Sequence, residues 1–141
     1  MAAIRVALLG YGLAGSAFHA PFIATTPGLE LAAVTTRNPK RRQHALSSYP
    51  GVQVLDEADE VWERAADFEL VVVATPNKLH LPHALGSFES GLPVVVDKPL
   101  APTADEGRAL VEAARDRGPE NKSARFGANH QIDILSPERI C

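Results

Sequence analysis

A glycine-rich segment follows the first apolar run of the chain, and its spacing from Gly10 to Gly15 is G-x-G-x-x-G. Gly10 permits a tight turn, Gly12 lets the backbone approach a pyrophosphate, and Gly15 lets a helix pack closely against a strand. The N–H groups and positive dipole at the start of such a helix bind phosphates. Between a predicted strand and a predicted helix, the motif predicts a dinucleotide site. A P-loop is excluded because no Gly-Lys-Ser/Thr follows.

The residues after the second predicted strand bear on the 2′ position of a bound dinucleotide. NAD enzymes usually place Asp or Glu there, whereas this chain has Thr36 and Arg37. A hydroxyl and a guanidinium would bind a 2′-phosphate through charge-assisted hydrogen bonds. We therefore expect NADP in preference to NAD, and interpret the cations at residues 40–42 as a solvated first helical turn.

Two further segments follow the fourth and fifth predicted strands, at the sheet edge where open α/β folds bind ligands. Thr75 and Pro76 come after the fourth strand, Asn77 can cap the next helix, and His80 lies in that helix's first turn. A structural and a functional role for His80 both remain open. Lys98 directly follows the fifth strand, where it can hydrogen-bond a substrate hydroxyl or support proton transfer. The alternative is a strand-end lysine that points to water.

These segments need a scaffold, which the apolar periodicity supplies. Strands are predicted at residues 4–9, 29–34, 52–55, 70–74 and 93–96, with continuously apolar runs typical of buried parallel strands. Helices are predicted at residues 14–25, 39–49, 59–66, 79–89 and 104–117, the last opened by a Thr103/Glu106 capping box. The pattern predicts one α/β domain, a doubly wound parallel sheet (Rossmann fold), at residues 1–118. Residues 119–141 are predicted to be an irregular tail, in which 131–135 can form a short edge strand.

The net charge and the cysteine content indicate which classes of binding partner and which cell compartment to expect. The 141 residues carry a net charge of -3, so we expect neither nucleic acid nor membrane as a partner. We interpret His19 as a packing residue, and neither a metal site nor a serine or cysteine triad is predicted. One cysteine and no signal-peptide pattern indicate a cytoplasmic protein.

Taken together, the motifs resemble the Gfo/Idh/MocA oxidoreductase family over residues 4–118. The segments that carry the resemblance are Gly10–Gly15, Phe18-His19-Ala20-Pro21, Ala74-Thr75-Pro76-Asn77 with His80, and Asp97-Lys98-Pro99-Leu100. The last motif is usually Glu-Lys-Pro, so Asp97 is a conservative departure.

The resemblance implies a role for each segment and a reaction. The residues that would bind the pyrophosphate are Gly10, Gly12, Leu13, Ala14 and Gly15. Thr75, Pro76 and Asn77 would line the channel for the adenosine and nicotinamide, and Lys98 would contact the substrate and nicotinamide. The reaction would be hydride transfer between nicotinamide and a hydroxyl or carbonyl group of a sugar-like or other small molecule.

Members of this family are usually more than twice as long, with a second domain that supplies most substrate contacts. We therefore expect this sequence to be a truncated product or an isolated domain that binds cofactor with little turnover. The alternative function is a non-catalytic NAD(P)-binding module. The surface that normally packs on the second domain predicts self-association.

Overall fold

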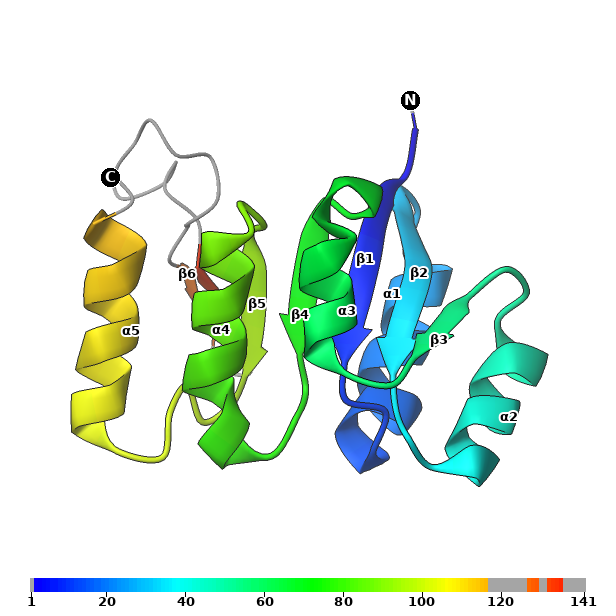
Figure 1. Cartoon of the computed structure of the whole chain (residues 1–141), viewed down its shortest axis with the longest axis horizontal. Helices are drawn as coiled ribbons and strands as arrows, with labels where there is room; N and C mark the ends of the chain where they lie inside the picture. Colours follow the sequence, from blue (N-terminus) through cyan, green and yellow to red (C-terminus); the bar gives the residue numbers. More distant parts are fainter. Residues whose placement is uncertain (1, 117–126, 130–131, 136–141) are drawn as a thin grey trace.

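The computed structural model describes residues 2–116, 127–129 and 132–135 of the chain (Figure 1). Five parallel strands form the predicted sheet: β1 (Ile4–Leu9), β2 (Leu29–Thr35), β3 (Gln53–Leu55), β4 (Leu70–Val73) and β5 (Val94–Asp97). Two short antiparallel strands, β6 (Gly127–Asn129) and β7 (Ile132–Leu135), extend it in the order β3-β2-β1-β4-β5-β7-β6. The prediction of a doubly wound parallel sheet is confirmed.

The region expected to be an irregular tail contains these two short strands. β7 lies within the segment proposed as an edge strand and pairs with β5, whereas no pattern in the sequence indicated β6. The polar part of the tail, residues 119–126, lies outside the described residues. Pairing with β5 satisfies backbone groups that an open sheet edge would leave exposed.

In the described residues, five α-helices alternate with the strands. They are α1 (Ala20–Thr25), α2 (Pro39–Ser48), α3 (Ala58–Glu63), α4 (His80–Glu89) and α5 (Ala104–Asp116); α2 and α5 begin where we predicted, whereas the starts of the other three differ. The first predicted helix begins with a π-helical turn, η1 (Gly15–His19), and α4 is preceded by a 3-10 turn, η3 (Asn77–Leu79). Thr103 caps α5 as expected, because its Oγ1 accepts a hydrogen bond from the Glu106 N–H at 3.2 Å.

The sheet separates two hydrophobic clusters. On one face α3, α4 and α5 bury side chains such as Val61, Phe88 and Leu110 against the strands. On the other face α1 and α2 contribute Ile23 and Ala45. Figure 1 shows α3, α4 and α5 in front of the sheet with α1 behind it. Helices on both faces explain why the central strands are continuously apolar.

The strand order reverses between β1 and β4. From β1 the chain proceeds outward to β2 and β3, and then returns to place β4 on the other side of β1. Ligands of open α/β sheets bind at the carboxyl ends of the strands at such a point. The glycine-rich turn follows β1 and Thr75 follows β4, so the topology brings these two predicted segments together.

Candidate functional site

The turn after β1 fits its surroundings only with glycine at position 10. Gly10 has a φ of +91°, and a Cβ added there would lie 2.7 Å from the carbonyl oxygen of Ala74. Its N–H donates a hydrogen bond to Thr35 Oγ1 at 2.9 Å. The turn is therefore held against the ends of both β2 and β4.

The other two glycines differ in how much space surrounds them. A Cβ at Gly15 would clash with the Gly10 carbonyl oxygen, so the helix could not start this close to the turn with another residue. A Cβ at Gly12 would meet only Arg41 Nη1, at 3.9 Å. Gly12 therefore borders open space, as a backbone that receives a phosphate requires.

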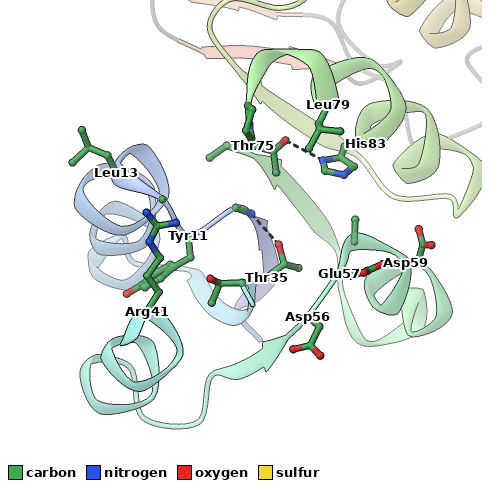
Figure 2. Close-up of a pocket in the computed structure, with 16 residues that line it drawn as sticks. Tyr11, Leu13, Thr35, Arg41, Asp56, Glu57, Asp59, Thr75, Leu79 and His83 are labelled. Carbon is green, nitrogen blue, oxygen red and sulfur yellow. Dashed lines mark hydrogen bonds between the residues drawn. The ribbon is translucent and has the colours of Figure 1, made fainter. Parts of the chain in front are cut away.

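A cavity of about 590 Å³ opens at this turn (Figure 2). Its volume lies in the range of pockets that bind small molecules and cofactors. The residues that line it come from the ends of β1 to β4 and the helices that follow: Gly10, Tyr11, Gly12, Leu13, Thr35, Thr36, Arg41, Asp56, Glu57, Ala58, Asp59, Ala74, Thr75, Pro76, Leu79 and His83.

The predicted binding residues divide into two groups. Those that line the cavity are Gly10, Gly12, Leu13, Thr36, Thr75 and Pro76. Those that do not line it are Ala14, Gly15, Arg37, Asn77, His80 and Lys98. Gly15 shapes the turn by packing against the Gly10 carbonyl group, and the other five residues lie outside the cavity lining.

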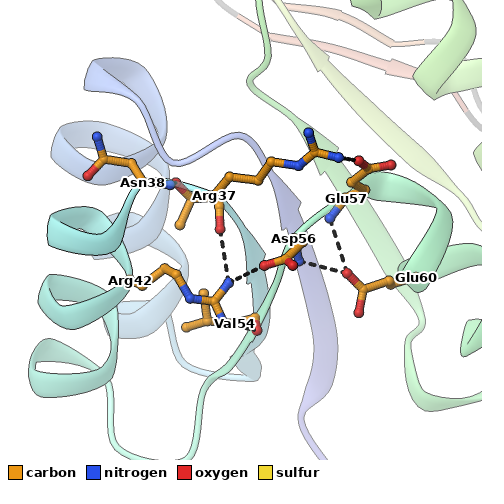
Figure 3. Close-up of polar contacts among 8 residues, drawn as sticks. Arg37, Asn38, Arg42, Val54, Asp56, Glu57 and Glu60 are labelled. Carbon is orange, nitrogen blue, oxygen red and sulfur yellow. Dashed lines mark hydrogen bonds and ion pairs between the residues drawn. The ribbon is translucent and has the colours of Figure 1, made fainter.

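The cations near β2 are arranged differently from the sequence interpretation. Arg37 is 70% exposed and pairs with the Glu57 carboxylate, so it lies at the rim (Figure 3). Arg41 is exposed, as we expected of a solvated cation, but it also lines the cavity beside Gly12. The helix start explains this position, because Asn38 caps α2 by accepting the Arg41 N–H at 3.1 Å.

Arg42 is also more than a solvated cation. Its guanidinium donates hydrogen bonds to the Thr36 carbonyl oxygen at 3.1 Å and to Asp56 Oδ1 at 2.5 Å (Figure 3). A longer bond of 3.4 Å reaches the Val54 carbonyl oxygen. Arg42 thereby fixes the end of β2 against β3, the two strand ends that form this wall of the cavity.

Sequence reasoning missed the acidic wall of the cavity. Asp56, Glu57 and Asp59 come from the end of β3 and the start of α3. Glu57 and Glu60 form a capping box at this helix start. Figure 2 shows Glu57 and Asp59 on the side of the cavity opposite Arg41. The cavity therefore has a cationic and an anionic side; the helix-start pattern of acidic residues was the available signal.

His83 is a second residue that the sequence reasoning missed. Its Nδ1 lies 2.9 Å from Thr75 Oγ1, within hydrogen-bonding distance. Burial lowers the pKa of His83, the nearby His80 lowers it further, and Asp59 acts in the opposite direction. A neutral His83 at pH 7 can thus orient the Thr75 hydroxyl at the cavity wall.

Tyr11 is the second residue of the glycine-rich turn and lines the cavity. Its ring is buried and its hydroxyl lies 2.8 Å from His44 Nδ1. Burial, with a smaller contribution from Tyr49, raises the pKa of Tyr11 to about 12. The phenol therefore stays protonated at neutral pH and connects the turn to α2.

His80, the first residue of α4, and Lys98, which follows β5, are both outside the cavity lining. His80 is only 1% exposed, so it faces neither solvent nor the cavity. Its ring nitrogens lie 2.7 Å from the Pro99 carbonyl oxygen and 2.9 Å from that of Thr75. His80 therefore connects the segments after β4 and β5, while Lys98 is exposed.

We expected His19 to be a packing residue; its burial agrees with this, and the structure adds a contact with a carboxylate. Its Nε2 lies 3.2 Å from Asp97 Oδ2, and both side chains are largely buried. The other oxygen, Asp97 Oδ1, accepts a hydrogen bond from the Lys98 N–H at 2.8 Å. The end of β5 thus contacts the first helical segment of the chain.

Two kinds of feature are absent from the described residues. No helix in residues 2–116 is long and apolar enough to cross a membrane. Within the part of the chain that the structure describes, no three His, Cys, Asp or Glu residues are grouped to hold a metal ion.

Residues 4–120 match the family model of the Gfo/Idh/MocA oxidoreductases, described as an oxidoreductase family with an NAD-binding Rossmann fold. The chain belongs to this family. The Gfo/Idh/MocA match covers the glycine-rich turn, both walls of the cavity and the Lys98 segment. It supports a nicotinamide dinucleotide as the cofactor of this fold.

Two curated Gfo/Idh/MocA relatives and one solved structure illustrate the similarity. Scyllo-inositol 2-dehydrogenase (NADP(+)) IolW of Bacillus subtilis (strain 168) is 36% identical over 115 residues, 82% of this chain and 31% of that protein. Inositol 2-dehydrogenase of Arthrobacter sp. (strain FB24) is 32% identical over 130 residues, 92% and 38% of the two chains. The WlbA dehydrogenase from Bordetella pertussis, in complex with NADH and UDP-GlcNAcA, is 28% identical with a TM-score of 0.71, over 79% and 32%. The chain spans about a third of the length of these proteins.

Proposed function

We propose that this chain binds NADP(H) in the cavity beside the glycine-rich turn and serves an oxidoreductase that acts on a sugar-like or other small molecule. The observation that carries the proposal is the turn itself. Gly10 and Gly15 exclude any side chain, and Gly12 borders open space at the strand-order reversal. The pyrophosphate would contact the backbone from Gly10 to Leu13, where the helical segment of residues 15–25 begins.

The 2′-phosphate would lie between Thr36 and Arg41. Both line the cavity, and the guanidinium of Arg41 lies beside Gly12. Arg37, paired with Glu57 at the rim, would contribute less than we expected from the sequence. The name of the B. subtilis relative supports NADP, whereas the NADH in the WlbA complex keeps NAD as the alternative.

Lys98 would act at the substrate. Bound nicotinamide supplies the site of hydride transfer, and the chain's own residues must orient the substrate and handle its hydroxyl proton. Lys98 lies at the carboxyl end of β5. His80 connects the segment of Lys98 to that of Thr75, because its ring nitrogens contact the carbonyl oxygens of Pro99 and Thr75. Its ammonium can hydrogen-bond the substrate oxygen and assist the transfer of its proton.

Fluorescence titration of the 141-residue chain with NADPH and NADH tests the binding proposal. We expect saturable binding with NADPH preferred, and Arg41→Met should weaken NADPH binding about tenfold while NADH binding changes little. Arg115→Met, on the exposed end of α5, is the matched control and should change neither affinity. Preference for NADH would overturn the NADP assignment, and no binding of either nucleotide would overturn the site.

A non-catalytic nucleotide-binding module is the second candidate, and one observation favours it. Lys98 is exposed and lies outside the cavity lining, so the described residues do not enclose a substrate beside it. Turnover requires a positioned substrate. Hydride transfer from a hydroxyl-bearing carbon of inositol to NADP⁺ by the 141-residue chain, lost in Lys98→Met, would exclude this candidate.

Self-association remains a prediction. Three large apolar side chains, Leu13, Phe18 and Phe22, are exposed on the first helical segment and the turn before it. Exposed apolar groups of this kind promote association. Sedimentation velocity across a range of concentrations tests it: a concentration-independent monomer would contradict the prediction.

A further inference from the structure

The carboxylate of Asp97 makes two contacts with different parts of the chain. Oδ2 lies 3.2 Å from His19 Nε2, and Oδ1 accepts the Lys98 N–H at 2.8 Å. The side chains of His19 and Asp97 are only 12% and 22% exposed, so water competes weakly with their pairing. One carboxylate therefore couples the imidazole of His19 to the backbone of Lys98.

His19 comes from the segment that the glycine-rich turn positions. It is the last residue of the π-helical turn η1, which begins at Gly15 directly behind that turn. Single π-helical turns are rare, and they occur frequently at functional sites. The turn that forms the nucleotide cavity is thus connected through η1 to the end of β5.

The other side of Lys98 is also held by an imidazole. His80 is buried and lies 2.7 Å from the Pro99 carbonyl oxygen. Asp97 before Lys98 and Pro99 after it are therefore each contacted by a histidine from a different helical segment. The long side chain of Lys98 is exposed, but its origin on the backbone is fixed.

We propose that His19 is a positioning residue for Lys98 and acts through Asp97. By orienting the Asp97 carboxylate, His19 fixes the backbone from which the Lys98 ammonium reaches toward the substrate. The functional consequence rests on the role proposed for Lys98; the positioning itself does not. Preorganised supporting contacts of this kind reduce the entropy lost when a flexible side chain engages a ligand.

Amide hydrogen exchange of the 141-residue chain, followed residue by residue by NMR, tests the positioning. In His19→Phe, which keeps a ring of similar size, the Lys98 amide should exchange about five- to tenfold faster. The Val95 and Val96 amides are the internal references for global stability and should not change. His19→Gln, whose amide nitrogen can replace Nε2, should restore exchange to within about twofold of the wild type. A merely packing histidine would give the opposite pattern, with His19→Phe harmless at Lys98.

A second variant keeps the test decisive if His19→Phe does not fold. Asp97→Asn preserves the shape of the side chain but removes its charge, and should also accelerate exchange at Lys98 with His19 in place. Unchanged Lys98 exchange in His19→Phe, or in Asp97→Asn where the first variant does not fold, would overturn the proposal. The exchange measurement needs no nucleotide. Failure of NADPH binding would therefore count against the proposed function but not against the positioning of Lys98 by His19.

Discussion

The glycine-rich turn and the Lys98 segment lie at the same edge of the sheet but are fixed by different means. At the turn, backbone meets backbone: the space beside Gly10 and Gly15 is filled by carbonyl groups and admits no Cβ. At the end of β5, imidazole side chains of His19 and His80 hold the chain through a carboxylate and a carbonyl oxygen. The first arrangement depends on the absence of side chains, and the second on particular ones. Substitutions should therefore affect the two regions differently.

The largest expected effect is at the turn, from Gly10→Ala. Alanine is strained at a φ of +91°, and its Cβ would lie 2.7 Å from the Ala74 carbonyl oxygen. We expect a loss of about 3 kcal/mol or more in the free energy of unfolding, together with loss of NADPH binding. Gly28→Ala is the matched control, because Gly28 also has a positive φ but nothing within 4 Å. It should cost only about 1 kcal/mol by urea unfolding, and equal costs would show that the close approach at Gly10 is unimportant.

The next largest effect is at the Lys98 segment, from His80→Ala. The change leaves a buried cavity and removes the partners of two carbonyl oxygens, those of Thr75 and Pro99. We expect a loss of about 2–4 kcal/mol in the free energy of unfolding. His44→Ala removes an exposed histidine and should cost no more than about 1 kcal/mol. If the two variants unfold at the same urea concentration, His80 does not hold the segment.

A smaller effect is expected at the turn, in the pH dependence of the free energy of unfolding. The pKa of Tyr11 is raised to about 12 in the folded chain, from an ordinary value of 10.0. Between these values the unfolded chain loses the phenol proton first, so the stability that Tyr11 contributes is present below pH 10 and is lost as the pH rises toward 12. Tyr11→Phe should flatten the decline of unfolding free energy measured from about pH 9 to 11. An identical decline in both proteins would show that the Tyr11 phenol is not shielded from water by burial.

The smallest expected effect is at the rim of the cavity, from Glu57→Gln. The Arg37–Glu57 pair is exposed and glutamine keeps a side-chain oxygen for the capping box, so stability should hardly change. The freed Arg37 should instead raise NADPH affinity about two- to threefold without a matching change for NADH. Glu63→Gln, an exposed change on the same helix, is the control. Weaker NADPH binding in Glu57→Gln would mean that the pair itself supports the site.

The glycine-rich turn, which backbone contacts hold in place, was predicted from the sequence better than the Lys98 segment, which side chains hold in place. Glycine spacing and apolar runs report directly on backbone geometry, so the sheet and the position of the turn follow from local pattern. Arg41 lies in the first turn of α2 and lines the cavity, whereas Arg37 precedes the cap residue and pairs with Glu57 at the rim; local pattern did not distinguish the two. His19 and Asp97 lie far apart in the chain, and no local pattern indicates that they meet.

The most direct measurement of the central claim is an amide NMR titration of the chain with NADPH. We expect the largest shifts at Gly10, Gly12 and Leu13, with further shifts at Thr36 and Thr75, whereas the amides of α5 stay unchanged. Saturable shifts confined to other residues, with the glycine-rich turn unaffected, would contradict the assignment of this turn as the nucleotide site.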